Sequence, residues 1–78
     1  MPKHIYIPNY WLRPPQPDRG GHPAVGCRWL RGGERHHDVE APVVDGCLQV
    51  AALPPKTPKK VVDMLHVLAG RITQGKLL

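Results

Sequence analysis

The chain has 78 residues, two cysteines, and eleven Lys and Arg against six Asp and Glu, which gives a formal net charge of +5. A chain of this length holds one domain and buries only about 60% of the surface of its unfolded state, so its core is thin and a deep catalytic cleft is not expected. It contains neither a secretory signal pattern nor an apolar run of about 18 residues that could span a bilayer. We therefore expect residues 1–78 to form one soluble, cytoplasmic domain that is not an enzyme and whose charge favours an acidic partner.

The first two predicted segments are an edge strand and a loop. Residues 3–12 are rich in aliphatic and aromatic side chains, which favours a strand, but Pro8 cannot donate to a sheet ladder and so confines the strand to an edge or bends it. Residues 13–23 contain four prolines and two glycines, which predicts a loop with some polyproline character. The pattern leaves the place of the first strand in the sheet open.

Residues 24–53 predict a three-stranded antiparallel meander. Asp45-Gly46 lies between two apolar segments and is a strong hairpin signal, because both central residues of a type I′ turn take positive φ. The two-residue loop would place six apolar residues on one face, pairing Val43 with Leu48, Ala41 with Val50, and Val39 with Ala52.

A second hairpin is predicted around Gly32-Gly33-Glu34. A three-residue loop there would pair Cys27 with Val39, Trp29 with His37, and Arg28 with Asp38. Both hairpins then bury the same face of the middle strand, whereas a slip of one residue would place charges in the core. The weak point is Glu34, which would occupy a left-handed position that such loops usually give to glycine.

Residues 57–74 predict an amphipathic helix. Thr57 suits the N-cap and Pro58 the first helical position, and apolar residues recur at helical spacing until Gly75. The predicted fold class is therefore α+β: a small antiparallel β-meander of three to four strands with one C-terminal helix packed on one face.

The sequence gives little support for a metal site or for a catalytic nucleophile. Cys27, His36, His37 and Cys47 are suitable zinc ligands, but adjacent strand residues point to opposite faces, so the two histidines cannot converge on one ion. In the predicted register Cys27 points inward and Cys47 outward, which argues against a disulfide. We expect no cofactor and no catalytic residue, and a zinc-stabilised module is the least favoured reading.

Aromatic and basic residues near the amino terminus are candidates for contact with a partner. Tyr10, Trp11, Arg13 and Arg19 form a stretch typical of surfaces that stack on bases or anchor a protein interface. The pattern does not decide whether Trp11 completes the thin core or projects into the partner.

A second candidate group lies at the start of the predicted helix. Lys56, Lys59 and Lys60 stand where the helix dipole disfavours cations by about 0.3–1 kcal/mol each. Together with the free backbone N–H groups there, they would suit a phosphate or carboxylate of a partner. The alternative is a solvated lysine cluster without a ligand.

In its size, its strand-rich domain with one helix, and its surface without an active site, the chain resembles the small inhibitors of phages and mobile elements, of which the anti-CRISPR proteins are the best known. The resemblance is one of class, without an aligned motif. It implies an inhibitor that binds a host protein or nucleoprotein effector complex in the host cytoplasm, such as a CRISPR effector complex, and blocks its interaction with nucleic acid. The alternative is a basic protein that binds nucleic acid nonspecifically or regulates transcription, with affinity that falls as salt rises.

Overall fold

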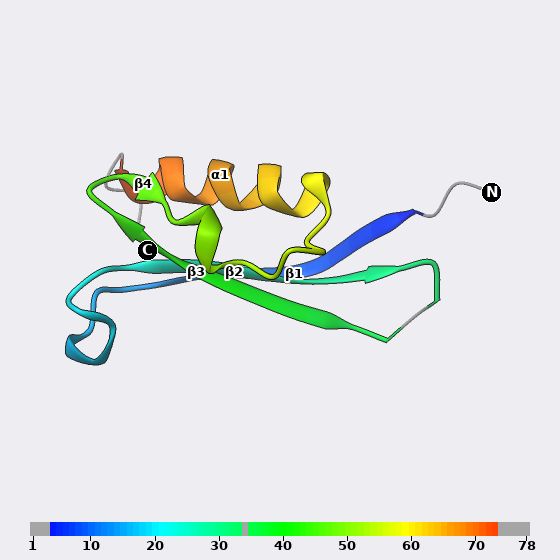
Figure 1. Cartoon of the computed structure of the whole chain (residues 1–78), viewed down its shortest axis with the longest axis horizontal. Coiled ribbons are helices and arrows are strands. Elements are labelled where there is room, and N and C mark those ends of the chain that lie inside the picture. The colour runs from blue at the N-terminus through cyan, green and yellow to red at the C-terminus, as the bar shows by residue number, and fades with distance from the viewer. Residues whose placement is uncertain (1–3, 34, 74–78) are drawn as a thin grey trace.

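The computed structural model describes residues 4–33 and 35–73, which form a four-stranded antiparallel sheet with one helix across one of its faces (Figure 1). The strands follow one another in the order of the chain: β1 (Ile5–Arg13), β2 (Ala24–Arg31), β3 (His37–Val44) and β4 (Cys47–Leu48). The helix is α1 (Lys59–Thr73). This is the α+β meander that the sequence predicts.

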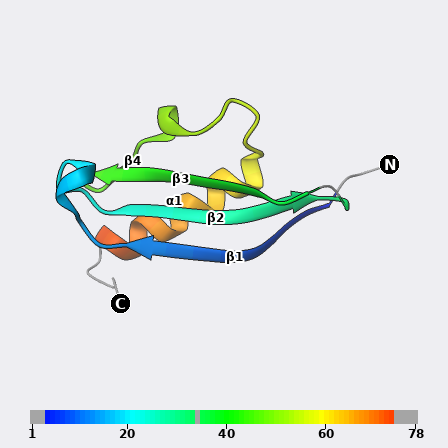
Figure 2. The ribbon, with the colours of Figure 1, turned by 90° about the horizontal axis from the view of Figure 1, so that it is seen from below.

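Strand β1 forms one edge of the sheet, and β2 lies between β1 and β3 (Figure 2). The register of the β1–β2 pairing shifts between Tyr6 and Asn9, which is where Pro8 cannot donate a ladder hydrogen bond. The predicted edge strand with an interruption at Pro8 is thus confirmed, although it continues through Arg13, which was expected in the loop. Its predicted start at residue 3 lies outside the described residues. The following proline-rich segment is a loop that contains one short 3-10 turn, η1 (Pro17–Arg19).

The registers of both hairpins are confirmed where their strands pair. Asp45 and Gly46 have φ of 53° and 80°, as a type I′ turn requires, and the strands pair Val43 with Leu48. Strands β2 and β3 pair Cys27 with Val39, Arg28 with Asp38, and Trp29 with His37. In the loop between them Gly32 and Gly33 take positive φ, while the prediction for Glu34 falls outside the described residues.

The predicted third strand of the meander is wrong beyond Leu48. Gln49 donates its N–H to the carbonyl of Pro42 at 3.0 Å, but Pro42 has no N–H to return, so the ladder ends there. The chain then forms a 3-10 turn, η2 (Val50–Ala52), in place of the expected pairs of Val50 with Ala41 and of Ala52 with Val39. Val50 is consequently 44% exposed rather than buried.

Helix α1 starts slightly later than predicted. The N–H groups of Val61 and Val62 both donate to the carbonyl of Pro58, so Pro58 holds the cap position and the N-cap predicted at Thr57 is wrong. The Thr57 hydroxyl donates instead to the carbonyl of Pro54 at 2.8 Å. The end predicted at residue 74 lies outside the described residues.

The core lies between α1 and the sheet. The helix buries Val61, Leu65, Leu68 and Ala69 against the inward residues of β2 and β3, and the η2 turn brings Leu53 into the same cluster. In the part of the chain that the structure describes, no helix has the length and apolar character needed to cross a membrane.

Candidate binding surfaces

The face of the sheet opposite α1 is not covered by any helix of the described residues (Figures 1 and 2). Side chains alternate along a strand, so the residues between the buried ones of β2 and β3 point to this side. Trp11, Gly26 and Glu40 form one row across β1, β2 and β3. We call this surface the open face, and its residues are Trp11, Arg13, Gly26, Arg28, Asp38 and Glu40.

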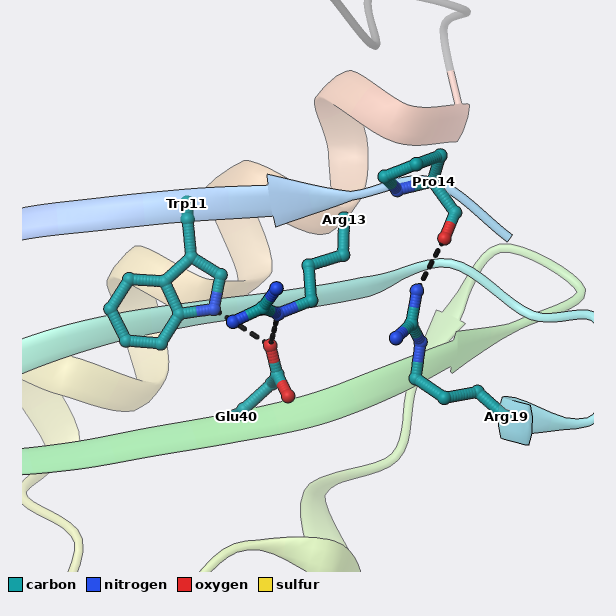
Figure 3. A network of polar contacts seen from close by, with 5 residues as sticks. All are labelled: Trp11, Arg13, Pro14, Arg19 and Glu40. Atoms are coloured by element: carbon teal, nitrogen blue, oxygen red, sulfur yellow. Dashed lines mark hydrogen bonds and ion pairs between the residues drawn. The ribbon is translucent and has the colours of Figure 1, made fainter. Parts of the chain in front are cut away.

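Trp11 lies flat across the open face. A Cβ atom built on Gly26 would come within 2.5 Å of the Trp11 ring, so the indole occupies the space that any other residue at position 26 would fill. The indole Nε1 donates to Oε2 of Glu40 at 2.7 Å, which fixes the orientation of the ring (Figure 3). Trp11 therefore neither completes the core nor projects freely: it is a half-buried aromatic platform.

Glu40 brings two of the predicted residues together. Arg13 donates from Nε to the same Oε2 atom that accepts from Trp11, and its guanidinium carbon is 6.0 Å from the centroid of the Trp11 ring (Figure 3). Burial alone would raise the pKa of Glu40, but the hydrogen bonds from Trp11 and Arg13 and the charges of Arg13 and Arg19 hold this pKa below its usual value. Glu40 thus stays ionised and holds both donors in place.

The remaining arginines near this surface also have acceptors within the chain. Arg19 donates from Nη2 to the carbonyl of Pro14 (Figure 3). Arg28 donates from Nε to Oδ1 of Asp38 at 2.9 Å, as the predicted pairing across β2 and β3 implies. The hydrogen bond from Arg28, with its charge, keeps the pKa of Asp38 below its ordinary value although desolvation opposes it.

The other predicted site residues lie elsewhere. Tyr10 pairs with the buried Cys27, so it lies on the helix side of the sheet, at the β1 edge, and is 45% exposed. Near the start of α1, Lys59 pairs with Asp63 at 3.1 Å and Lys60 donates to the carbonyl of Ile5 at 3.3 Å. Lys56 lies in the segment that leads into the helix. The seven predicted residues therefore do not form one surface.

The two cysteines are in different environments. Cys27 is a buried free thiol, and burial, helped by the charge of Asp38, raises its pKa to about 11. Cys47 is exposed. Of the histidines considered as zinc ligands, His37 stacks its ring on Trp29, with 4.5 Å between the ring centroids. Within residues 4–33 and 35–73, no three or more His, Cys, Asp or Glu side chains are placed to hold a metal ion.

Sequence reasoning missed the two residues that position Trp11. Gly26 interrupts an otherwise β-forming segment, and an isolated glycine inside a strand often marks the close approach of another group. That signal was present, but the partner of Gly26 depends on the register of β1, which the pattern did not give. Glu40 carries no comparable signal.

Comparison of the chain with protein-family models, with curated proteins and with solved structures found no match in any of the three.

Proposed function

We propose that this chain is a non-enzymatic binding protein that uses the open face to dock on a host protein or nucleoprotein complex, as a phage-type inhibitor of the anti-CRISPR kind would. The observation that carries the proposal is the platform made by Trp11 over Gly26. Its ring is already fixed by Glu40 before a partner arrives, so binding costs little additional side-chain entropy. A large aromatic side chain held in this way is the type of residue that dominates protein interfaces.

The charges of the open face favour a protein partner over a bare polyanion. Arg13 pairs with Glu40 and Arg28 with Asp38, so two cations on this face are accompanied by two carboxylates. A phosphate backbone would have to break these pairs and would meet both carboxylates. A protein surface with charges of both signs can instead complement them.

The test is an affinity capture of the tagged chain from nuclease-treated host lysate, with washing at high salt. We expect one stoichiometric protein or complex that is retained by the wild type and lost by Trp11→Ala and by Arg28→Glu. Val67→Ser, on the exposed surface of α1, is the matched control and should retain it. Retention of the same protein by all three variants would contradict the assignment of the open face.

Nucleic-acid binding is the second candidate, and the lysines near the start of α1 favour it. Lys56, Lys59 and Lys60 lie away from the open face and add to the net charge of +5. If all three contact phosphates of duplex DNA, the logarithm of the binding constant should fall with the logarithm of salt concentration with a slope of about −3. Fluorescence anisotropy with a labelled duplex measures this slope, and Lys56→Gln should reduce it by about one unit.

A further inference from the structure

A pocket of ≈ 690 Å³ lies where β2 ends, β3 begins and the chain enters α1. Its volume falls in the range of about 300–1,000 Å³ that is typical of small-molecule sites. The lining residues that bear on its chemistry are Trp29, Arg31, His36, His37, Asp38 and Lys56. Trp29 and His37 point to the helix side of the sheet, so this pocket is separate from the Trp11 platform. Asp38 is the one residue that belongs to both the open face and the lining of the pocket.

Two of the residues that line the pocket carry a buried N–H donor that has no acceptor within the described residues. Trp29 is only 8% exposed, and its indole Nε1 is buried without a hydrogen bond. The Nε atom of Arg31 is likewise buried and has no hydrogen bond. The other tryptophan differs, since Nε1 of Trp11 donates to Glu40. Buried N–H groups in folded proteins nearly always find an acceptor, so this pair calls for an acceptor from outside the described chain.

The charged groups of the wall indicate what that acceptor is. Arg31 and Lys56 contribute two cations that can only donate hydrogen bonds. Asp38 is the one carboxylate in the described lining, and Arg28 already pairs with it. Two cations, one of which carries an unpaired Nε–H, and the unpaired indole N–H of Trp29 match an oxyanion. A phosphate offers these groups more acceptor oxygens and more negative charge than a carboxylate does.

We infer that this pocket binds a small molecule that carries a phosphate group, with Arg31 and Lys56 on the phosphate and the indole N–H of Trp29 as a further donor. The stacked pair of Trp29 and His37 forms an aromatic wall for the organic part of the ligand. The volume of the pocket exceeds that of a bare phosphate, which leaves room for such a part. The inference does not depend on a partner at the open face, so either can fail alone.

The two indole N–H signals in an ¹⁵N–¹H correlation spectrum of the whole chain provide the test. Inorganic phosphate and adenosine 5′-monophosphate should each move the Trp29 signal saturably and leave the Trp11 signal in place, with Trp11→Phe used to assign the two. Adenosine and acetate, which lack the phosphate, should move neither. Tighter binding of the monophosphate than of inorganic phosphate identifies an organic phosphate as the ligand, and equal affinity identifies free phosphate.

Matched variants separate this site from general attraction of anions. Arg31→Gln and Lys56→Gln should each weaken binding of the monophosphate about tenfold, the usual effect of losing a hydrogen bond to a charged group. Lys59→Gln removes the same charge from a lysine that pairs with Asp63 and does not line the pocket, so its affinity should be that of the wild type. The inference is overturned if the Trp29 signal does not move with millimolar phosphate, or if adenosine moves it as much as the monophosphate does. It is also overturned if all three variants lose the same affinity for the monophosphate.

Discussion

Replacing Gly26 by alanine tests directly whether Trp11 lies on the sheet as described. The added Cβ would come within 2.6 Å of three atoms of the Trp11 ring, which is closer than real Cβ contacts come, so the indole must move. The displaced indole loses its hydrogen bond to the ionised Glu40, which is worth about 1.5–3 kcal/mol. Alanine itself stabilises the folded state by about 0.5–1 kcal/mol relative to glycine, because it is less flexible in the unfolded chain. We expect a net loss of about 1–2 kcal/mol in the free energy of unfolding.

Thermal and urea denaturation measure this loss, which corresponds to a fall of about 5–15 °C in Tm for a domain of this size. Gly70→Ala is the control: this glycine lies in α1, and a Cβ there meets nothing within 4 Å. That variant should gain about 0.5–1 kcal/mol. In a Trp11→Ala background the cost of Gly26→Ala should disappear, because the clash no longer exists. A Gly26→Ala protein as stable as the wild type, or an equal loss in both backgrounds, would refute the reasoning.

Three further predictions concern the thiols, the acid range and the core. Cys47 is exposed, whereas Cys27 is buried and its pKa is about 11, so its thiolate is about 100-fold scarcer than at the ordinary thiol pKa of 9.0. A disulfide reagent should therefore modify one cysteine in the native chain and two in urea. Because the pKa of Glu40 is lower in the folded state, its carboxylate stabilises the fold at pH values above the pKa of an ordinary Glu. This contribution is lost as the pH falls through the lowered pKa. Denaturation from about pH 5 to about pH 3 should therefore show a steeper loss for the wild type than for Glu40→Gln, and equal slopes would contradict this. Leu65→Ala, at a residue that is 0% exposed, should cost about 2–5 kcal/mol in urea denaturation, against less than about 0.5 kcal/mol for Val67→Ala at a residue that is 56% exposed.

The parts of the fold that local chemistry determines were predictable. Positive φ at Asp45 and Gly46 sets the register of the last hairpin, and the alternation of apolar residues sets that of β2 and β3. The error came from extending the strand after Asp45-Gly46 through residues 49–53, because its apolar residues would pair with those of residues 39–41. Pro42, on the facing strand, lacks the N–H that a ladder of that length needs, so the sequence did contain the information that shortens β4.

The candidate sites were less predictable because they depend on contacts between distant strands. Which residue of β2 faces Trp11 depends on the register of β1, and Pro8 shifts that register within the strand. Without this register, Trp11, Arg13 and Arg19 could be grouped by composition, but Glu40 could not be identified as the acceptor that Trp11 and Arg13 share. The pocket beside Trp29 was unpredictable for a similar reason, because its lining comes from the end of one hairpin and from the segment before α1.

Four basic residues lie at these two sites, and their surroundings differ in a way that bears on function. On the open face, Arg13 and Arg28 are paired with carboxylates, which limits nonspecific attraction and leaves shape and the Trp11 platform to select a partner. In the pocket at the other site, Arg31 and Lys56 face only one carboxylate among the described lining residues, and Arg28 already engages it. A net charge of +5 therefore does not describe one basic surface. Binding of a macromolecule at the open face should depend weakly on salt, whereas binding of a small anion in the pocket should weaken clearly as salt rises.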